Sequence, residues 1–138
     1  MSRRDKTHDL VRTALEKEGW TVTDDPFYIK IGRKSAQIDL GAERVIIAEK
    51  ESEKIAVEVK SFTAASTLTE FYHALGQFLM YQSALKNTDP ERVLYLALPA
   101  DAYTELSEDI FNFNHFEHLN HHLIVYNTIE IEALTWIK

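Results

Sequence analysis

The sequence predicts a single α/β domain in which a central mixed β-sheet is flanked by helices. With 138 residues, the chain is long enough for one hydrophobic core but too short for two. Apolar residues recur at helical spacing near the start and again in the middle of the chain, and strand-like stretches lie between and after these two helices. No internal repeat, low-complexity segment or Gly/Ser linker divides the chain. We therefore expect residues 1–138 to form one domain with helices packed on a sheet.

The first half of the chain is predicted to run from a helix into an antiparallel meander. The helix covers residues 5–18, because its apolar residues follow helical spacing and Gly19 then ends the pattern. Turns are expected near Pro26, at Gly32 and over residues 51–53. The strands that these turns delimit are residues 27–31, 36–40, 44–50 and 54–62.

The last strand of this meander alternates with a period of two. Ile55, Val57 and Val59 share one face, and Glu58 and Lys60 lie on the opposite face together with an alanine. One face is thus expected to pack on the core, and the other to carry polar groups.

A long helix over residues 68–86 begins the second half. Thr67 and Glu70 have the spacing of a capping box, which satisfies amide groups at a helix start. The apolar residues of the helix form one stripe. The members of the predicted stripe are Phe71, Leu75, Phe78, Leu79 and Leu85.

Strands and helices alternate after this helix. Residues 92–98 are continuously apolar, which is typical of a strand covered on both faces. A helix is expected over residues 102–111, a buried strand over 122–126 and a short terminal element over 129–137. This order completes a mixed sheet flanked by helices.

Composition and charge narrow the classes of function. The formal net charge is -7, which argues against tight, autonomous DNA binding because phosphate contacts require a basic surface. Lys30, Arg33 and Lys34 form a local basic spot around a turn and are candidate DNA-binding residues; scattered solvated charge is the alternative. The absence of cysteine excludes disulfides and thiolate metal sites. The polar start and the lack of a long apolar run predict a cytoplasmic protein without a membrane segment.

Asp39, Glu58 and Lys60 are the leading candidates for catalysis. Strand geometry puts Glu58 and Lys60 on one face about 7 Å apart, and Asp39 belongs to an earlier strand of the same meander. Two converging carboxylates make an all-oxygen site suited to Mg²⁺ or Mn²⁺, with the Val59 carbonyl as a further candidate ligand. A lysine beside such a site can orient an attacking water or stabilise phosphoryl charge. The alternative is an ordinary polar strand face.

Two helices offer supporting residues. Gln77 and Tyr81 lie one turn apart, with Glu70 on nearly the same line, and are candidates to line an active site. Asp9 in the first helix is a candidate auxiliary metal ligand, although a solvated acid in a first turn is the simpler interpretation.

A histidine-rich segment extends to His122. His118 and His122 have the i, i+4 spacing of zinc ligands on a helix. The segment also contains His115 and His121, but no cysteine or recognised acidic motif accompanies them. A polar connection is the preferred interpretation.

The sequence resembles the XisH family over nearly its whole length. The resemblance is carried by residues 19–26, 39–44, 54–62, 74–77 and 91–97, of which the block Val57 to Phe62 is the most specific. The family is named for a cyanobacterial factor that controls excision of the fdxN DNA element during heterocyst development, beside a protein called XisI. The resemblance implies a restriction-endonuclease-like fold and a XisI-like partner.

The pattern of Asp39, Glu58 and Lys60 also resembles the active-site motif of the PD-(D/E)xK superfamily. Gln77 and Tyr81 after it resemble its RecB-like branch, but Ile38 stands where the motif has proline. The leading hypothesis is a Mg²⁺-dependent nuclease in DNA rearrangement. The rival is a regulatory binding module on the same scaffold that cuts nothing, and a homodimer is a further candidate assembly.

Overall fold

The computed structural model describes residues 3–46, 51–63, 65–109, 119, 121–129 and 133–137. The helices are α1 (Arg3–Lys17), α2 (Thr67–Thr88) and α3 (Ala100–Asp109). The strands are β1 (Thr21–Asp24), β2 (Phe27–Ile31), β3 (Lys34–Ile38), β4 (Leu40–Ile46), β5 (Glu51–Val59), β6 (Arg92–Pro99), β7 (Leu123–Tyr126) and β8 (Thr135–Ile137).

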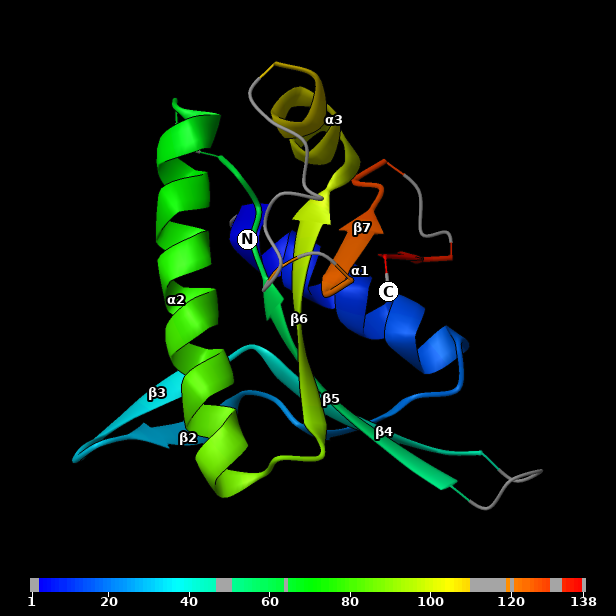
Figure 1. Cartoon of the computed structure of the whole chain (residues 1–138). Coiled ribbons are helices and arrows are strands. Elements are labelled where there is room, and N and C mark those ends of the chain that lie inside the picture. The colour runs from blue at the N-terminus through cyan, green and yellow to red at the C-terminus, as the bar shows by residue number, and fades with distance from the viewer. Residues whose placement is uncertain are drawn as a thin grey trace.

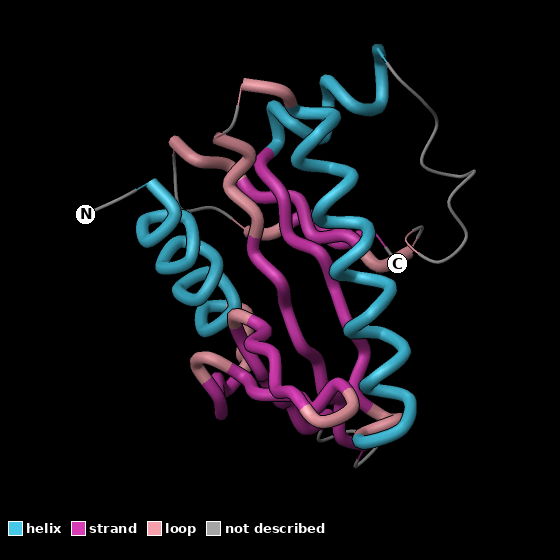
Figure 2. The backbone as a smooth tube through the Cα atoms, turned by 90° about the vertical axis from the view of Figure 1, so that its left-hand side faces the viewer, coloured by secondary structure: helices cyan, strands magenta, loops and turns pink. Residues whose placement is uncertain are grey.

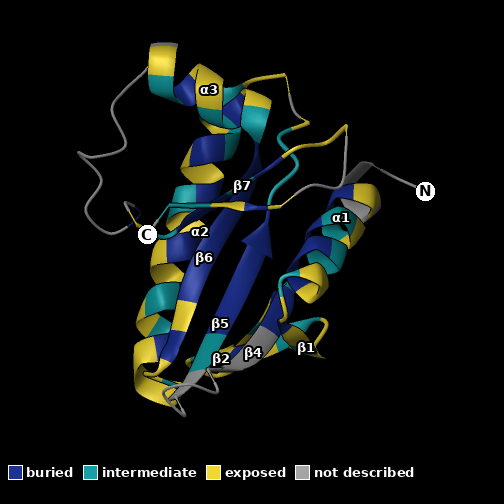
Figure 3. Ribbon diagram, turned by 90° about the vertical axis from the view of Figure 1, so that its right-hand side faces the viewer, coloured by how far each residue is buried: buried dark blue, intermediate teal, exposed yellow. Residues whose placement is uncertain are grey.

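Six of the strands form one mixed sheet in the order β1-β4-β5-β6-β7-β8. The central strands β5, β6 and β7 are parallel, and the strands toward each edge pair antiparallel with their neighbours. Helix α1 covers one face of this sheet and α2 the other (Figures 2 and 3). The predicted α/β class and mixed sheet flanked by helices are confirmed, and the arrangement is consistent with a nuclease-like α/β fold.

The predicted four-strand meander is wrong in one respect. Strands β2 and β3 pair only with each other and form a separate hairpin, whose turn at Gly32 has φ 63° (Figure 1). The chain bends at Asp39 before β4 begins and enters the main sheet. The edge position beside β4 is taken by β1, a strand that the sequence did not predict because three of its four residues are polar.

A glycine allows this change of direction. A Cβ at Gly41 would lie 3.1 Å from the ring of Phe27 and 3.3 Å from Asp24. The base of the hairpin and the end of β1 therefore approach β4 at a point where a larger residue would need both neighbours to shift.

Several predicted boundaries also change. The turn expected over residues 51–53 is the start of β5, which ends at Val59 rather than at residue 62. Of the predicted strand 44–50, residues 47–50 lie outside the described part, as do residues 110 and 111 of the third helix. The predicted elements 92–98, 122–126 and 129–137 correspond to β6, β7 and β8, with residues 130–132 outside the described part.

The predicted cap and stripe of α2 need correction. Ser66, not Thr67, caps the helix, since its side chain accepts a hydrogen bond from the Thr69 amide (3.2 Å). Leu79 is 40% exposed because it lies on the outer side of the helix. The buried face of α2 consists of Phe71, Ala74, Phe78, Tyr81 and Leu85.

The alternation of β5 divides the core into two clusters, one on each side of the sheet. Ile55, Val57 and Val59 pack with apolar residues of α1. Ala56 packs with α2 on the opposite face. The predicted alternation is therefore confirmed, but the face of Glu58 lies beneath a helix instead of facing water. Within the described ranges, no helix is long and apolar enough to cross a membrane.

Candidate active site

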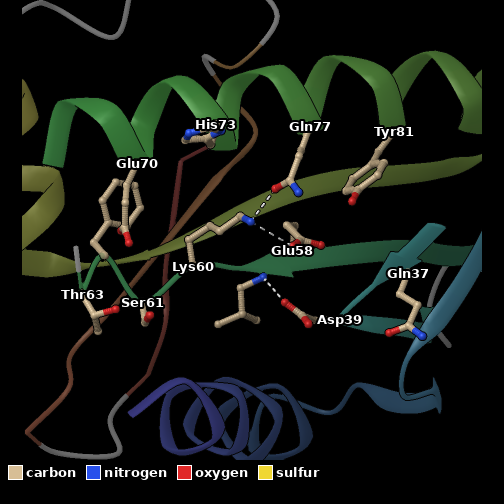
Figure 4. A pocket seen from close by; sticks show the side chains of 12 residues that line it. Gln37, Asp39, Glu58, Lys60, Ser61, Thr63, Glu70, His73, Gln77 and Tyr81 are labelled. Carbon is tan, nitrogen blue, oxygen red and sulfur yellow. Dashed lines mark hydrogen bonds and ion pairs between the residues drawn. The ribbon is translucent and has the colours of Figure 1, made fainter. Parts of the chain in front are cut away.

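A polar cavity of about 440 Å³ opens where β5 ends, between this strand and α2 (Figure 4). Its walls come from the bend before β4, from the end of β5 with the loop that follows, and from one edge of α2. The lining residues are Gln37, Asp39, Glu58, Val59, Lys60, Ser61, Phe62, Thr63, Glu70, His73, Gln77 and Tyr81. All five candidate catalytic residues from the sequence therefore line a single cavity.

Glu58 is the most buried charged group of the cavity, with only 5% of its surface exposed. Its Oε2 has no hydrogen-bond partner within the described residues, and its Oε1 lies 3.5 Å from the Lys60 ammonium. Burial raises the pKa of the Glu58 carboxyl to about 7, and the charge of Asp39 adds to this rise, whereas Lys60 opposes it. A buried carboxylate oxygen without a partner is costly, so it is well placed to receive a cation or a proton.

Asp39 reaches the cavity from the bend between β3 and β4, not from within a strand. Pairing of β4 with β5 begins at Leu40 and Val57, so the amide of Val59 has no partner in β4. Asp39 Oδ2 accepts a hydrogen bond from this amide at 2.8 Å. The bond holds the Asp39 carboxylate beside Glu58, as the sequence predicted, but by a different route.

Lys60 is held by both its backbone and its side chain. Its amide donates to the Ala97 carbonyl of β6 (2.8 Å), and its carbonyl accepts from the Tyr126 hydroxyl of β7 (2.7 Å). Its ammonium donates to Gln77 Oε1 at 2.5 Å and pairs with Glu58 (Figure 4). The parallel strands β6 and β7 thus hold the backbone of Lys60, and helix α2 holds its ammonium in the cavity.

One edge of α2 supplies the facing wall. Gln77 and Tyr81 both point from the helix toward the strands (Figure 4). Burial, together with the charges of Glu58 and Asp39, raises the pKa of Tyr81, so its hydroxyl keeps its proton and is available as a donor.

Sequence reasoning missed five residues that line the cavity: Gln37, Ser61, Phe62, Thr63 and His73. His73 lies four positions before Gln77, so helical spacing alone would have identified it. The hydroxyl residues Ser61 and Thr63 lie in the loop after Lys60, where no periodic pattern marks them.

Helix α1 places His8, rather than the predicted Asp9, next to Asp39. Asp9 is exposed and does not line the cavity. Its neighbour His8, rotated by about 100° on the helix, has Nδ1 3.8 Å from Asp39 and Nε2 2.8 Å from Asp25. Burial acts to raise the pKa of Asp25, but hydrogen bonds from His8 and Arg12 lower it below its ordinary value.

The remaining candidates lie elsewhere. Lys30, Arg33 and Lys34 are exposed on the β2–β3 hairpin, outside the cavity. His115 and His118 lie outside the described residues. In the described ranges, no three histidine or acidic side chains cluster as a metal site by themselves.

His122 has a structural environment. Its Nδ1 lies 3.1 Å from the Leu94 carbonyl, and its ring packs against Phe78 and Tyr95. This placement agrees with the preference for a connection over a zinc site at this residue.

The XisH family model matches residues 1–134 of the chain. The chain belongs to the XisH family. It is similar to a crystal structure of an XisH family protein from Nostoc punctiforme, with 39% identity, TM-score 0.83, and coverage of 97% of this chain and 100% of that one. It is also similar to a fdxN element excision controlling factor protein from Anabaena variabilis, with 38% identity, TM-score 0.84, and coverage of 98% and 100%. No curated protein matches the chain.

Proposed function

We propose that this XisH-family chain is a Mg²⁺- or Mn²⁺-dependent nuclease of the PD-(D/E)xK kind that acts in the excision of a DNA element. The observation that carries the proposal is the buried Glu58 carboxylate beside Asp39 in an open polar cavity, whose Oε2 has no hydrogen-bond partner in the part of the chain that the structure describes. The name of the Anabaena variabilis relative, a fdxN element excision controlling factor, supports the biological setting.

The donor set fits a hard divalent cation. Asp39, Glu58 and the Val59 carbonyl would hold it through oxygen atoms, as Mg²⁺ prefers. Two carboxylates are enough, because Mg²⁺ commonly completes its shell with water and substrate phosphate oxygens. When bound, the cation supplies a Lewis acid for a phosphodiester and a water of lowered pKa.

The other side chains of the cavity have distinct roles in this proposal. Lys60 faces the scissile phosphate, where its charge stabilises the negative charge that develops during hydrolysis. Gln77 keeps the lysine ammonium directed into the cavity through the bond to its Oε1. The protonated Tyr81 hydroxyl is a donor for a phosphate oxygen or a water.

A second function is favoured by the formal net charge of -7, which weakens the attraction of the chain for DNA. In this second function, the chain is a regulatory module that works with a XisI-like protein and cleaves no DNA. The two functions differ in whether the cavity binds a divalent cation.

The test is cleavage of supercoiled plasmid with Mg²⁺ or Mn²⁺, compared with the same protein in EDTA. Glu58→Gln keeps the side-chain volume and removes the charge, and it is expected to abolish cleavage. The matched control is Glu91→Gln, since Glu91 is exposed and lies outside the cavity. Equal cleavage by the Glu58 and Glu91 variants would show that the activity is a contaminant.

Metal binding is measured separately, as the change in the midpoint temperature of thermal unfolding during titration with Mn²⁺. Millimolar Mn²⁺ is expected to raise the midpoint of the wild-type chain and of Glu91→Gln, but not that of Glu58→Gln. No rise for the wild type, together with no cleavage, would favour the regulatory module.

A further inference from the structure

We propose that a groove between α2 and the β2–β3 hairpin binds an unpaired DNA strand and leads it into the cavity of the candidate active site. This inference rests on the proposed function and deepens it, because it names single-stranded DNA as the substrate class. The groove has a volume of about 580 Å³. The residues that line it are Ile31, Ala36, Tyr72, His73, Gly76, Gln77, Met80 and Tyr81.

The groove adjoins the cavity. His73, Gln77 and Tyr81 line both the groove and the cavity, so this edge of α2 forms a wall that the two hollows share. A chain lying in the groove therefore contacts side chains that also line the cavity of Glu58 and Lys60.

The groove is lined mainly by apolar and aromatic side chains, which favour contact with nucleobases. Tyr72 is 62% exposed and Met80 54%. Gly76 has no atom within 4 Å of where a Cβ would lie, which leaves a low point between them. Aromatic side chains beside an open floor can stack with unpaired bases of any sequence.

The lining of the groove also carries no negative charge that would repel a nucleic acid. None of its lining residues is acidic, although the chain as a whole carries a net charge of -7. The 22-residue helix α2 carries one acid, Glu70, and one lysine, Lys86. A phosphate backbone in the groove thus avoids the repulsion that it would meet over most of the surface.

A basic hairpin adjoins the groove. Ile31 and Ala36 belong to the β2–β3 hairpin, which crosses α2 and projects beyond it (Figure 1). Its turn region carries the exposed residues Lys30, Arg33 and Lys34. A strand that leaves the groove meets these cations. An unpaired strand fits better than a duplex, because only unpaired bases expose the faces that Tyr72 can stack against.

The experiment measures binding of a fluorescent oligothymidine of about 15 nucleotides by anisotropy in EDTA. Tyr72→Ala is expected to weaken binding about tenfold, the loss of one stacked base. Tyr28→Ala is the matched control, since Tyr28 is also 62% exposed but alternates with Ile31 and faces away from the groove. Its affinity is expected to stay within about twofold, a change too small for a lost stacked base.

A second arm tests the charge. Replacing Lys30, Arg33 and Lys34 together with alanine is expected to lower the slope of log Kd against log salt by about 2, at about 0.7 for each lost phosphate contact. A duplex of the same length is expected to bind more weakly than the single strand and to be insensitive to Tyr72→Ala.

Three results would overturn the proposal: no binding of the oligonucleotide by the wild type, equal affinities for the two tyrosine variants, or a dimer that Tyr72→Ala dissociates without changing the affinity. The last result would assign the groove to a second copy of the chain. The assay needs no cleavage, so the groove stands if binding behaves as expected and the plasmid stays intact. Conversely, the nuclease stands if Glu58-dependent cleavage occurs and the tyrosine variants bind alike.

Discussion

Replacing Glu58 with glutamine is expected to stabilise the metal-free protein at alkaline pH. The folded-state pKa of Glu58 is about 7, against an ordinary value of 4.5. Well below pH 4.5 the carboxyl is protonated in both the folded and the unfolded chain, so its burial costs no folding free energy through ionisation. As the pH rises from 4.5 to about 7, the unfolded chain releases this proton while the folded chain retains it, so the stability present at low pH is progressively lost, and the loss levels off above the folded-state pKa.

The magnitude follows from the difference between these two pKa values. At roughly 1.36 kcal/mol for each pH unit, it corresponds to about 3 kcal/mol of lost folding free energy by pH 8 to 9. Glu58→Gln removes this pH dependence, and its neutral amide avoids the cost. The variant is expected to gain about 2 to 3 kcal/mol over the wild type near pH 8 and little near pH 5.

Urea unfolding in EDTA at several pH values measures this difference. Glu91→Gln is the control, because Glu91 is exposed and lies outside the cavity. A stability difference between wild type and Glu58→Gln that does not change from pH 5 to pH 8 would refute the reasoning. It would mean that the Glu58 carboxylate is solvated in the folded chain.

Two further substitutions test how the site is held. Tyr126→Phe removes the hydroxyl that donates to the Lys60 carbonyl and is expected to cost about 1 kcal/mol in urea unfolding. It should also lower the rate of any Glu58-dependent cleavage, and full activity would show that this bond does not position the lysine. Arg92→Met leaves Asp89 and the Ile55 carbonyl without their buried donor and is expected to cost about 3 kcal/mol. A loss below about 1 kcal/mol would show that water replaces the guanidinium.

The local pattern of the sequence was enough to predict the candidate site in outline. The period-2 alternation of β5 put Glu58 and Lys60 on one face, and helical spacing put Gln77 and Tyr81 one turn apart. These positions could be predicted because strand and helix periodicity depend only on backbone geometry. The α/β class followed in the same way, from the order of helical and strand patterns.

Long-range packing decided what that pattern left open. The sequence placed Asp39 in a meander strand, but a bend there releases the β2–β3 hairpin from the main sheet and turns the carboxylate to the Val59 amide. Neighbouring positions on α1 are equally polar, and only docking against the bend selects His8 over Asp9.

The sequence by itself determined that Glu58 and Lys60 point to the same side of the chain, and it predicted a second carboxylate, Asp39, from a neighbouring segment. Tertiary structure decided that Glu58 is buried beneath α2 with a pKa of about 7, and that one of its oxygens has no hydrogen-bond partner among the described residues. The physical reason is that alternation specifies a face of a strand, whereas burial depends on which helix covers that face. A covering helix arrives from a distant part of the chain, and its effect on a carboxylate is electrostatic and cannot be read from spacing.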